Sequence, residues 1–256
     1  ERKSEAEKSL DTGIHLAKEA GSSSWSPFVL EAIALANSQA NSTRVDQLVL
    51  ELAKAVRETP KDLIVLRDWE TSLGLVTSRT GPAASIDSAL RSYLEQFDIT
   101  KAEHALAATA LLLRRSQFLL QSRSADKELW KAQAPTLIES LEKLLASAAE
   151  NQELRNTRSL ENVHRAAGDL LFRLSQDSTG ATANADPNIL ERAITHYQQA
   201  LAESVSALTP QAQKAIQRYY QKRIDLDNIR SEAMESTKEL DDHVLATWGL
   251  RYSLLM

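Results

Sequence analysis

Apolar side chains recur three and four positions apart along most of the chain, which is the spacing that places them on one face of an α-helix. The first run passes through Leu10 and Ile14 and ends before Gly21 and a serine cluster. Strong helix formers fill the stretches between such breaks, whereas residues typical of strands never cluster. The pattern therefore predicts an all-α protein, an elongated multi-helix bundle of about nine helices.

The helices predicted in the first part of the chain are short and start at regular intervals. Ser26 matches an N-cap, and further starts fall near Thr43 and Thr59, about 17 residues apart. The helix from Thr59 has Leu63 on its apolar face. The interval is half of a helix-pair repeat of roughly 34 residues, so an α-solenoid remains open. The interval is lost after Gly81.

Longer helices are predicted in the second part of the chain. A capping box begins at Thr100 and opens the first of them. A last helix runs without a breaker from Thr209 to Gly249, about 60 Å at 1.5 Å per residue. We therefore expect a module of short helices over residues 1–98 and a module of long helices over 99–256, which could stack as two bundles.

Composition narrows the classes of function. The chain is 43% apolar and 25% charged, as expected for a folded globular protein. A net charge of −5 without a basic stripe argues against a nucleic-acid partner. The absence of cysteine excludes thiolate nucleophiles, iron–sulfur clusters and cysteine-ligated zinc. Glycine-rich phosphate loops and hydrolase elbows are also absent, so we expect a protein without catalytic activity or cofactor.

One spacing resembles a metal motif. Glu161 and His164 form an E-x-x-H pair of the kind that binds two irons in helical bundles. Such a site needs a second copy on another helix, and the sequence has none. The five histidines lie on separate predicted helices, and His164 is expected at the flank of a helix surface. We therefore predict no metal site.

Polar side chains interrupt the apolar face of the first long helix. Thr109, Ser116 and Arg123 recur there at heptad spacing. Arg115 points away from this face on a helical wheel and is expected to be solvated. A cation on an apolar face needs an anionic partner, because unpaired burial costs several kcal/mol.

The last helix repeats this pattern with Arg230 close to its apolar stripe. The planar guanidinium group binds carboxylates with two parallel hydrogen bonds. We therefore name Arg123, Arg230, Thr109 and Ser116 as candidate ligand-binding residues for a small organic anion. The alternative is that the two arginines form internal salt bridges with carboxylates of neighbouring helices.

A resemblance to a known class of domain rests on the segment 107–120, which reads AATALLLRRSQFLL, and on the long helices after it. These features resemble the extracytoplasmic sensor regions of bacterial chemoreceptors and sensor kinases, in particular the helical bimodular type. The resemblance implies a homodimeric ligand-binding domain at the periplasmic face of the inner membrane. Residues 1–98 depart from it, because their first helix ends early.

Two hypotheses of function follow. The first is a non-catalytic sensor domain of a bacterial transmembrane receptor that binds a small organic anion or a periplasmic binding protein. No apolar run is long enough to span a bilayer, so membrane attachment would come only from segments outside this chain. The second is a cytoplasmic α-helical repeat that acts as a scaffold or adaptor between proteins.

Overall fold

The computed structural model describes residues 2–21, 25–150, 160–178 and 187–205, and every regular element in these ranges is a helix. This confirms the predicted all-α, multi-helix fold. The nine helices in these ranges are α1 (Arg2–Glu19), α2 (Ser26–Ser38), α3 (Ser42–Glu58), α4 (Leu63–Thr77), α5 (Ala83–Leu94), α6 (Ala102–Ser122), α7 (Lys127–Glu150), α9 (Leu160–Ser178) and α10 (Pro187–Val205).

The chain divides into two compact units, Glu1–Thr157 (unit 1) and Arg158–Met256 (unit 2). The boundary expected between residues 98 and 99 lies inside unit 1, in the link between α5 and α6. Trp69 of α4 contacts residues on both sides of this boundary. Its ring centroid lies 5.4 Å from that of Phe97, and its indole nitrogen donates to the carbonyl oxygen of Ala107 at 3.2 Å. The structure therefore divides the chain later than the helix lengths indicate.

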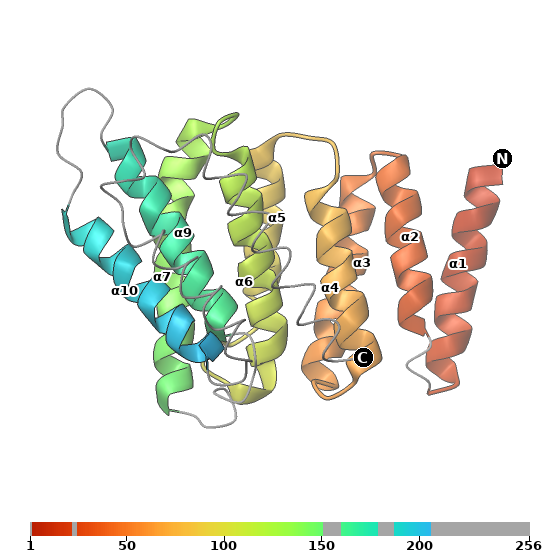
Figure 1. The fold of residues 1–256 in the computed structure, drawn as a ribbon. Coiled ribbons are helices and arrows are strands. Elements are labelled where there is room, and N and C mark those ends of the chain that lie inside the picture. Colours follow the sequence, from red (N-terminus) through yellow and green to blue (C-terminus); the bar gives the residue numbers. More distant parts are fainter. Residues whose placement is uncertain (1, 22–24, 151–159, 179–186, 206–256) are drawn as a thin grey trace. The chain divides into compact units, whose positions relative to one another are not determined.

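The helices of unit 1 form two layers (Figure 1). In the first layer α2 packs on α4 and α4 packs on α6, and in the second α3 packs on α5. The helices of the first layer run parallel. Ser26 and Asn37 of α2 bond to Asp68 and Leu75 of α4 in the same order along both helices. We call these the α2/α4/α6 layer and the α3/α5 layer.

Two helix starts in unit 1 follow ordinary capping chemistry. The Asn41 side chain accepts from the backbone N–H of Arg44 at 3.1 Å, and the Asp62 carboxylate accepts from those of Ile64 and Val65. Both residues satisfy N–H groups that the first helical turn leaves unpaired. These two caps fix the first residues of α3 and α4.

Other predicted starts are wrong in detail. Ser26 does not cap α2, because its hydroxyl donates to Asp68 in the protein interior at 2.6 Å. α4 begins at Leu63 rather than near Thr59. The Thr100 hydroxyl donates to the Asp98 carboxylate, so the predicted capping box does not form and α6 starts at Ala102 without a side-chain cap. At Ser26 and Thr100 a carboxylate competes for the hydroxyl, whereas the Thr59 hydroxyl donates to the carbonyl oxygen of Ala55.

Helix α7 continues through Pro135 from Lys127 to Glu150. Proline removes one N–H donor and crowds the preceding turn, yet the helix is not divided into two elements here. The predicted last helix, over residues 209–249, lies outside the described residues and stays a prediction.

Helices α9 and α10 of unit 2 pack closely along their length. Gly168 permits this approach, because a Cβ atom at that position would lie 2.7 Å from Cε1 of Tyr197. Tyr197 is fully buried, and its hydroxyl donates to the Asp169 carboxylate at 2.8 Å. Ala193 and Ala200 of α10 are also fully buried. The close packing of α9 against α10 therefore requires a glycine at position 168.

Candidate functional site

Carboxylates join neighbouring helices in unit 1. Asp68 of α4 accepts from the Ser26 hydroxyl of α2 at 2.6 Å. Its other oxygen accepts from Nε and Nη2 of Arg67 at 3.2 and 3.0 Å. The Asp68 side chain is buried, whereas that of Arg67 extends into solvent. This carboxylate therefore connects α2 to α4 within the same layer.

Asp46 of α3, whose side chain is 37% exposed, joins the second layer. It accepts from the Tyr93 hydroxyl of α5 at 2.5 Å and from Nη1 of Arg79 at 2.8 Å. Burial, followed by the hydrogen bond to Asp46, raises the pKa of the Tyr93 hydroxyl far above its usual range. Tyr93 therefore keeps its proton and acts as a permanent donor between α3 and α5.

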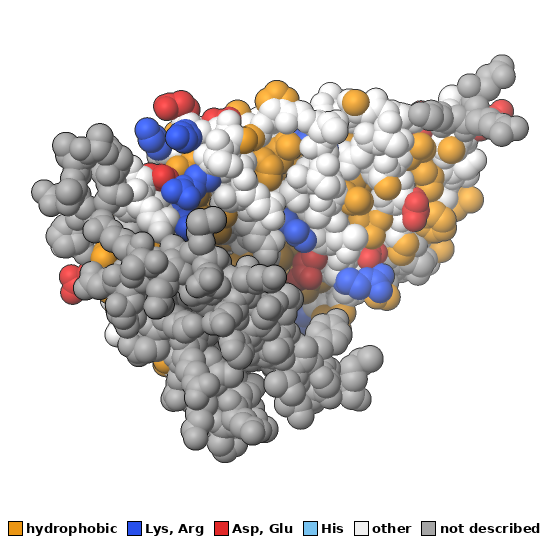
Figure 2. All heavy atoms as spheres, turned by 45° about the horizontal axis from the view of Figure 1, so that its top comes forward, with side chains coloured by type: hydrophobic (Ala, Val, Ile, Leu, Met, Phe, Trp, Pro, Cys, Tyr) orange, Lys and Arg blue, Asp and Glu red, His pale blue; other side chains and the backbone are white. Residues whose placement is uncertain are grey.

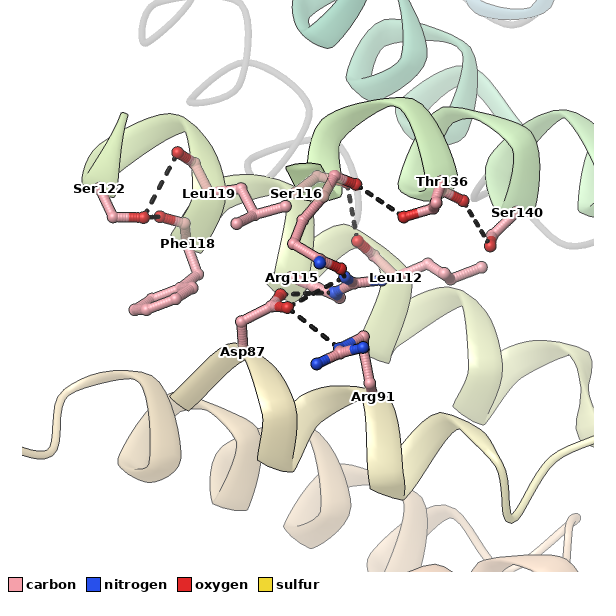
Figure 3. A network of polar contacts seen from close by, with 11 residues as sticks. Asp87, Arg91, Leu112, Arg115, Ser116, Phe118, Leu119, Ser122, Thr136 and Ser140 are labelled. Atoms are coloured by element: carbon pink, nitrogen blue, oxygen red, sulfur yellow. Dashed lines mark hydrogen bonds and ion pairs between the residues drawn. The ribbon is translucent and has the colours of Figure 1, made fainter. Parts of the chain in front are cut away.

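The most buried of these contacts joins α5, α6 and α7 (Figure 3). Asp87 is fully buried and Arg115 is 3% exposed. Nε and Nη2 of Arg115 donate to the two Asp87 oxygens at 2.7 and 3.1 Å, and Nη2 also donates to Gln133 at 3.0 Å. Arg91 lies 3.2 Å from the same carboxylate. The pair has the bidentate geometry that makes arginine–carboxylate contacts strong.

The prediction that Arg115 is solvated is therefore wrong. The helical wheel of α6 has one apolar stripe, but α4, α5 and α7 all pack on this helix. Three neighbours cover more than one face, so a side chain outside the stripe is buried as well. The sequence suggested a salt bridge from Arg123 to a neighbouring helix as an alternative. On α6 it is Arg115 that forms such a salt bridge, with Asp87 of α5.

The predicted ligand residues of α6 lie in different surroundings. Thr109 and Ser116 are buried, and the Ser116 hydroxyl donates to the carbonyl oxygen of Leu112 at 2.8 Å. Arg123 is half-buried at the C-cap of α6, with its guanidinium carbon 5.9 Å from the centroid of the Trp130 ring. Arg230 lies outside the described residues. The site that would combine these four residues for a small anion stays a prediction.

Two histidines that are distant in sequence meet in unit 2. Nδ1 of His164 lies 3.0 Å from Nδ1 of His196, and the ring centroids are 5.3 Å apart. Burial, followed by the charge of His196, lowers the pKa of His164 to about 4. His164 is thus half-buried between helices rather than on a helix flank. In the parts of the chain that the structure describes, no three histidine, aspartate or glutamate side chains are grouped to hold a metal ion.

The two layers of unit 1 expose different side chains. Phe28 of α2, Leu63 and Ile64 of α4, and Leu106 of α6 are exposed, Leu63 by 75% and Leu106 by 39%. Over their described lengths, α3 and α5 expose no large hydrophobic side chain. Leu63 had been assigned to an inward face, but it precedes the first buried residue of α4, Val65. The α2/α4/α6 layer therefore carries the apolar positions open to a partner.

Charged groups accompany these apolar side chains. Burial raises the pKa of Glu70 on α4, and the nearby Arg114 of α6 opposes this shift. Nη2 of Arg114 lies 3.5 Å from the position that a Cβ atom on Gly74 would occupy. In the view of Figure 2, acidic, basic and hydrophobic side chains all reach the surface of the described part of the chain. The exposed positions of α4 and α6 therefore include both apolar and charged side chains.

No family model, curated protein or solved structure matches the chain.

The candidate site is the outer face of the α2/α4/α6 layer, which we define by Leu63, Arg67, Glu70, Leu106 and Arg114. Periodicity alone places such positions outside a core, but it does not distinguish the layer that exposes apolar residues from the layer that does not. The carboxylates of Asp46, Asp68 and Asp87 already accept hydrogen bonds from other helices. Their role is therefore to stabilise the fold, and they do not form the candidate site. None of the helices in the described ranges is apolar over a length that would cross a bilayer.

Proposed function

We propose that unit 1 is a non-catalytic helical-repeat module that binds a segment of another protein on the outer face of its α2/α4/α6 layer. The observation that carries the proposal is the combination of two facts. Alternate helices pack in parallel as in stacked helical repeats, and the exposed large hydrophobic side chains of these layers lie on one of them alone. This is the scaffold alternative of the sequence analysis.

The chemistry of the face supports a peptide partner. Protein interfaces combine a few apolar anchors with surrounding polar groups, and a single small ligand would instead need a concave pocket. Leu63 and Leu106 are exposed on adjacent parallel helices, and Arg67, Glu70 and Arg114 lie on the same two helices. The partner we propose is a segment with apolar side chains spaced along it and charges of both signs between them.

The sensor hypothesis stays a prediction of the resemblance, together with its periplasmic location, its anion or binding-protein ligand and its homodimer. Part of its support, the long last helix, falls on residues that are not described. Within unit 1 the helices have between 12 and 24 residues, and each layer is built by packing helices side by side. This arrangement favours the repeat module over a bundle of shared long helices.

The proposal can be tested with peptides selected from a random display library against the full chain. Binding of the selected peptides is then measured by titration to wild type and to Leu106→Asp and Leu63→Asp. A buried carboxylate would oppose an apolar anchor, so we expect affinity to fall by about tenfold or more, equivalent to about 1.4 kcal/mol.

Matched controls place the same charge on the other layer. Ser88→Asp on α5 and Gln47→Asp on α3 change exposed positions and should leave affinity unchanged. Melting temperatures of all four variants should remain near that of wild type, because none of these side chains is buried. Equal losses on both layers, or a library that gives no specific binder, would refute a docking face on α2/α4/α6.

A further inference from the structure

A cavity of about 590 Å³ lies in unit 1 where the end of α1 meets α3 and the start of α4. Its volume is enough for a long side chain with space for water around it. The charged and aromatic side chains that line it belong to different elements and are separate from the candidate docking face. They are Lys18, Trp25, Glu51, Lys54, Glu58 and Asp62.

One cation already lies on the aromatic wall of this cavity. The Lys18 ammonium is 4.5 Å from the centroid of the Trp25 ring and forms an ion pair with Glu51. An indole face combined with a carboxylate is the pair of groups by which proteins hold ammonium and guanidinium ions. Burial lowers the pKa of Lys18, and the neighbouring charge of Lys54 lowers it further. The position over the indole ring, beside the Glu51 carboxylate, is therefore one that a cation already occupies.

The charges of the lining favour a cation over an anion. The cavity has three carboxylates, on Glu51, Glu58 and Asp62, and two ammonium groups. Lys54 lies 3.9 Å from Glu58, and Lys18 pairs with Glu51, so both ammonium charges are balanced within the cavity. When Lys18 turns outward, three carboxylates face a single ammonium. The side chain is 36% exposed and has four rotatable carbon links, so it can do this without moving α1.

We propose that this cavity binds an arginine or lysine side chain of a protein partner, which takes the place of the Lys18 ammonium over the Trp25 ring. Lys18 acts as an internal competitor that covers the ring until the partner arrives. A guanidinium group is favoured, because it stacks on an indole and can donate to Glu51 and Glu58 together. The inference uses none of the residues of the docking face and does not depend on it.

The test follows the indole N–H resonance of Trp25 in the full chain labelled with ¹⁵N-tryptophan, assigned through Trp25→Leu. The probe is the tetrapeptide Gly-Arg-Arg-Gly amide, with Gly-Glu-Glu-Gly amide as the matched acidic peptide. We expect the arginine peptide to shift the Trp25 resonance in a saturable way and the acidic peptide to leave it in place. Spermidine serves as the free polyamine and should bind more weakly than the arginine peptide.

Variants separate a cation site from an anion site by the sign of their effect. Lys18→Met removes the competitor and should strengthen arginine-peptide binding by at least about threefold, an effect that misfolding would not produce. Glu51→Gln should weaken binding by about tenfold, and Lys8→Met, an exposed change elsewhere on α1, should have no effect. Weaker binding by Lys18→Met, a response to the acidic peptide, equal binding of spermidine, or no Trp25 shift would each overturn the proposal.

Discussion

Units 1 and 2 share one means of joining their described helices and differ in another. In unit 1 the carboxylates Asp46, Asp68 and Asp87 each accept hydrogen bonds from a side chain on another helix. In unit 2 the Asp169 carboxylate likewise accepts from the Tyr197 hydroxyl, but the described helices α9 and α10 also meet where Gly168 leaves space for the Tyr197 ring. A carboxylate holds two helices together through its charge and hydrogen-bond geometry. A glycine lets two helices approach closely because it has no side chain. The stability of a carboxylate contact should therefore be most sensitive to the loss of a charge. The stability of a contact at a glycine should be most sensitive to an added methyl group.

The largest effect is expected from removing one partner of the buried pair in unit 1. Asp87→Ala leaves the Arg115 guanidinium, 3% exposed, without its carboxylate. Breaking a buried ion pair from one side costs about 3–5 kcal/mol in the free energy of unfolding. Urea denaturation followed by circular dichroism measures this loss.

The double variant Asp87→Leu with Arg115→Met tests whether charge pairing causes that loss. It replaces both partners by apolar side chains of similar size, so its stability should return to about that of wild type or above. Arg91 is half-exposed and can turn toward solvent when Asp87 is absent. A double variant as unstable as Asp87→Ala would show that packing, and not the unpaired charge, holds α5 to α6.

The close approach in unit 2 predicts the next largest effect. Gly168→Ala places a Cβ atom 2.7 Å from the buried Tyr197 ring, so the helices must separate. Overpacking of this kind costs about 1–3 kcal/mol. Hydrogen exchange of α9 and α10, followed by mass spectrometry, should show protection falling by about tenfold or more.

Gly74→Ala in α4 of unit 1 is the matched control. A Cβ atom there meets only Arg114, at 3.5 Å, which is an ordinary contact with a flexible side chain. Alanine is the better helix former, so this variant should be more stable than wild type by up to about 1 kcal/mol. The same substitution therefore has opposite signs in the two units. Equal effects at both glycines would contradict the contrast.

The smallest effect concerns the pH dependence of α9. The folded-state pKa of His164 is about 4, below the ordinary value of 6.5. The unfolded chain therefore binds a proton first as the pH falls, and stability is lost between about pH 6.5 and 4, with no further loss below that range from this group. The ring is partly exposed and solvent screens its charge, so we expect a change of about tenfold or less in hydrogen-exchange protection of α9.

His164→Gln should remove this pH dependence, while His15→Gln on the exposed face of α1 should leave it unchanged. Exchange rates are compared after correction for the known pH dependence of unfolded peptides. A wild-type α9 whose protection is constant between pH 4 and 6.5 would show that burial of the histidine pair does not control this helix.

Much of the secondary structure follows from the sequence. The three-and-four spacing gives the helices, and Gly21 and Gly81 mark breaks between them, both with positive φ angles of 67° and 149°. Helix starts were less reliable, because Ser26 and Thr100 are ordinary capping residues whose hydroxyls bond to Asp68 and Asp98 instead. A local pattern cannot show which distant or neighbouring carboxylate competes for a hydroxyl.

The sequence by itself determined that this chain is helical, because the spacing of apolar residues and the preference for helix formers act within a few turns. Only the tertiary structure decided that Arg115 is buried against Asp87, that His164 meets His196, and that Leu63 is exposed. A helical wheel predicts a single buried side for each helix. Several neighbouring helices cover α6, however, whereas the start of α4 is open at Leu63. Burial depends on how many neighbours a helix has, and that number is set by the packing of elements far apart in the chain.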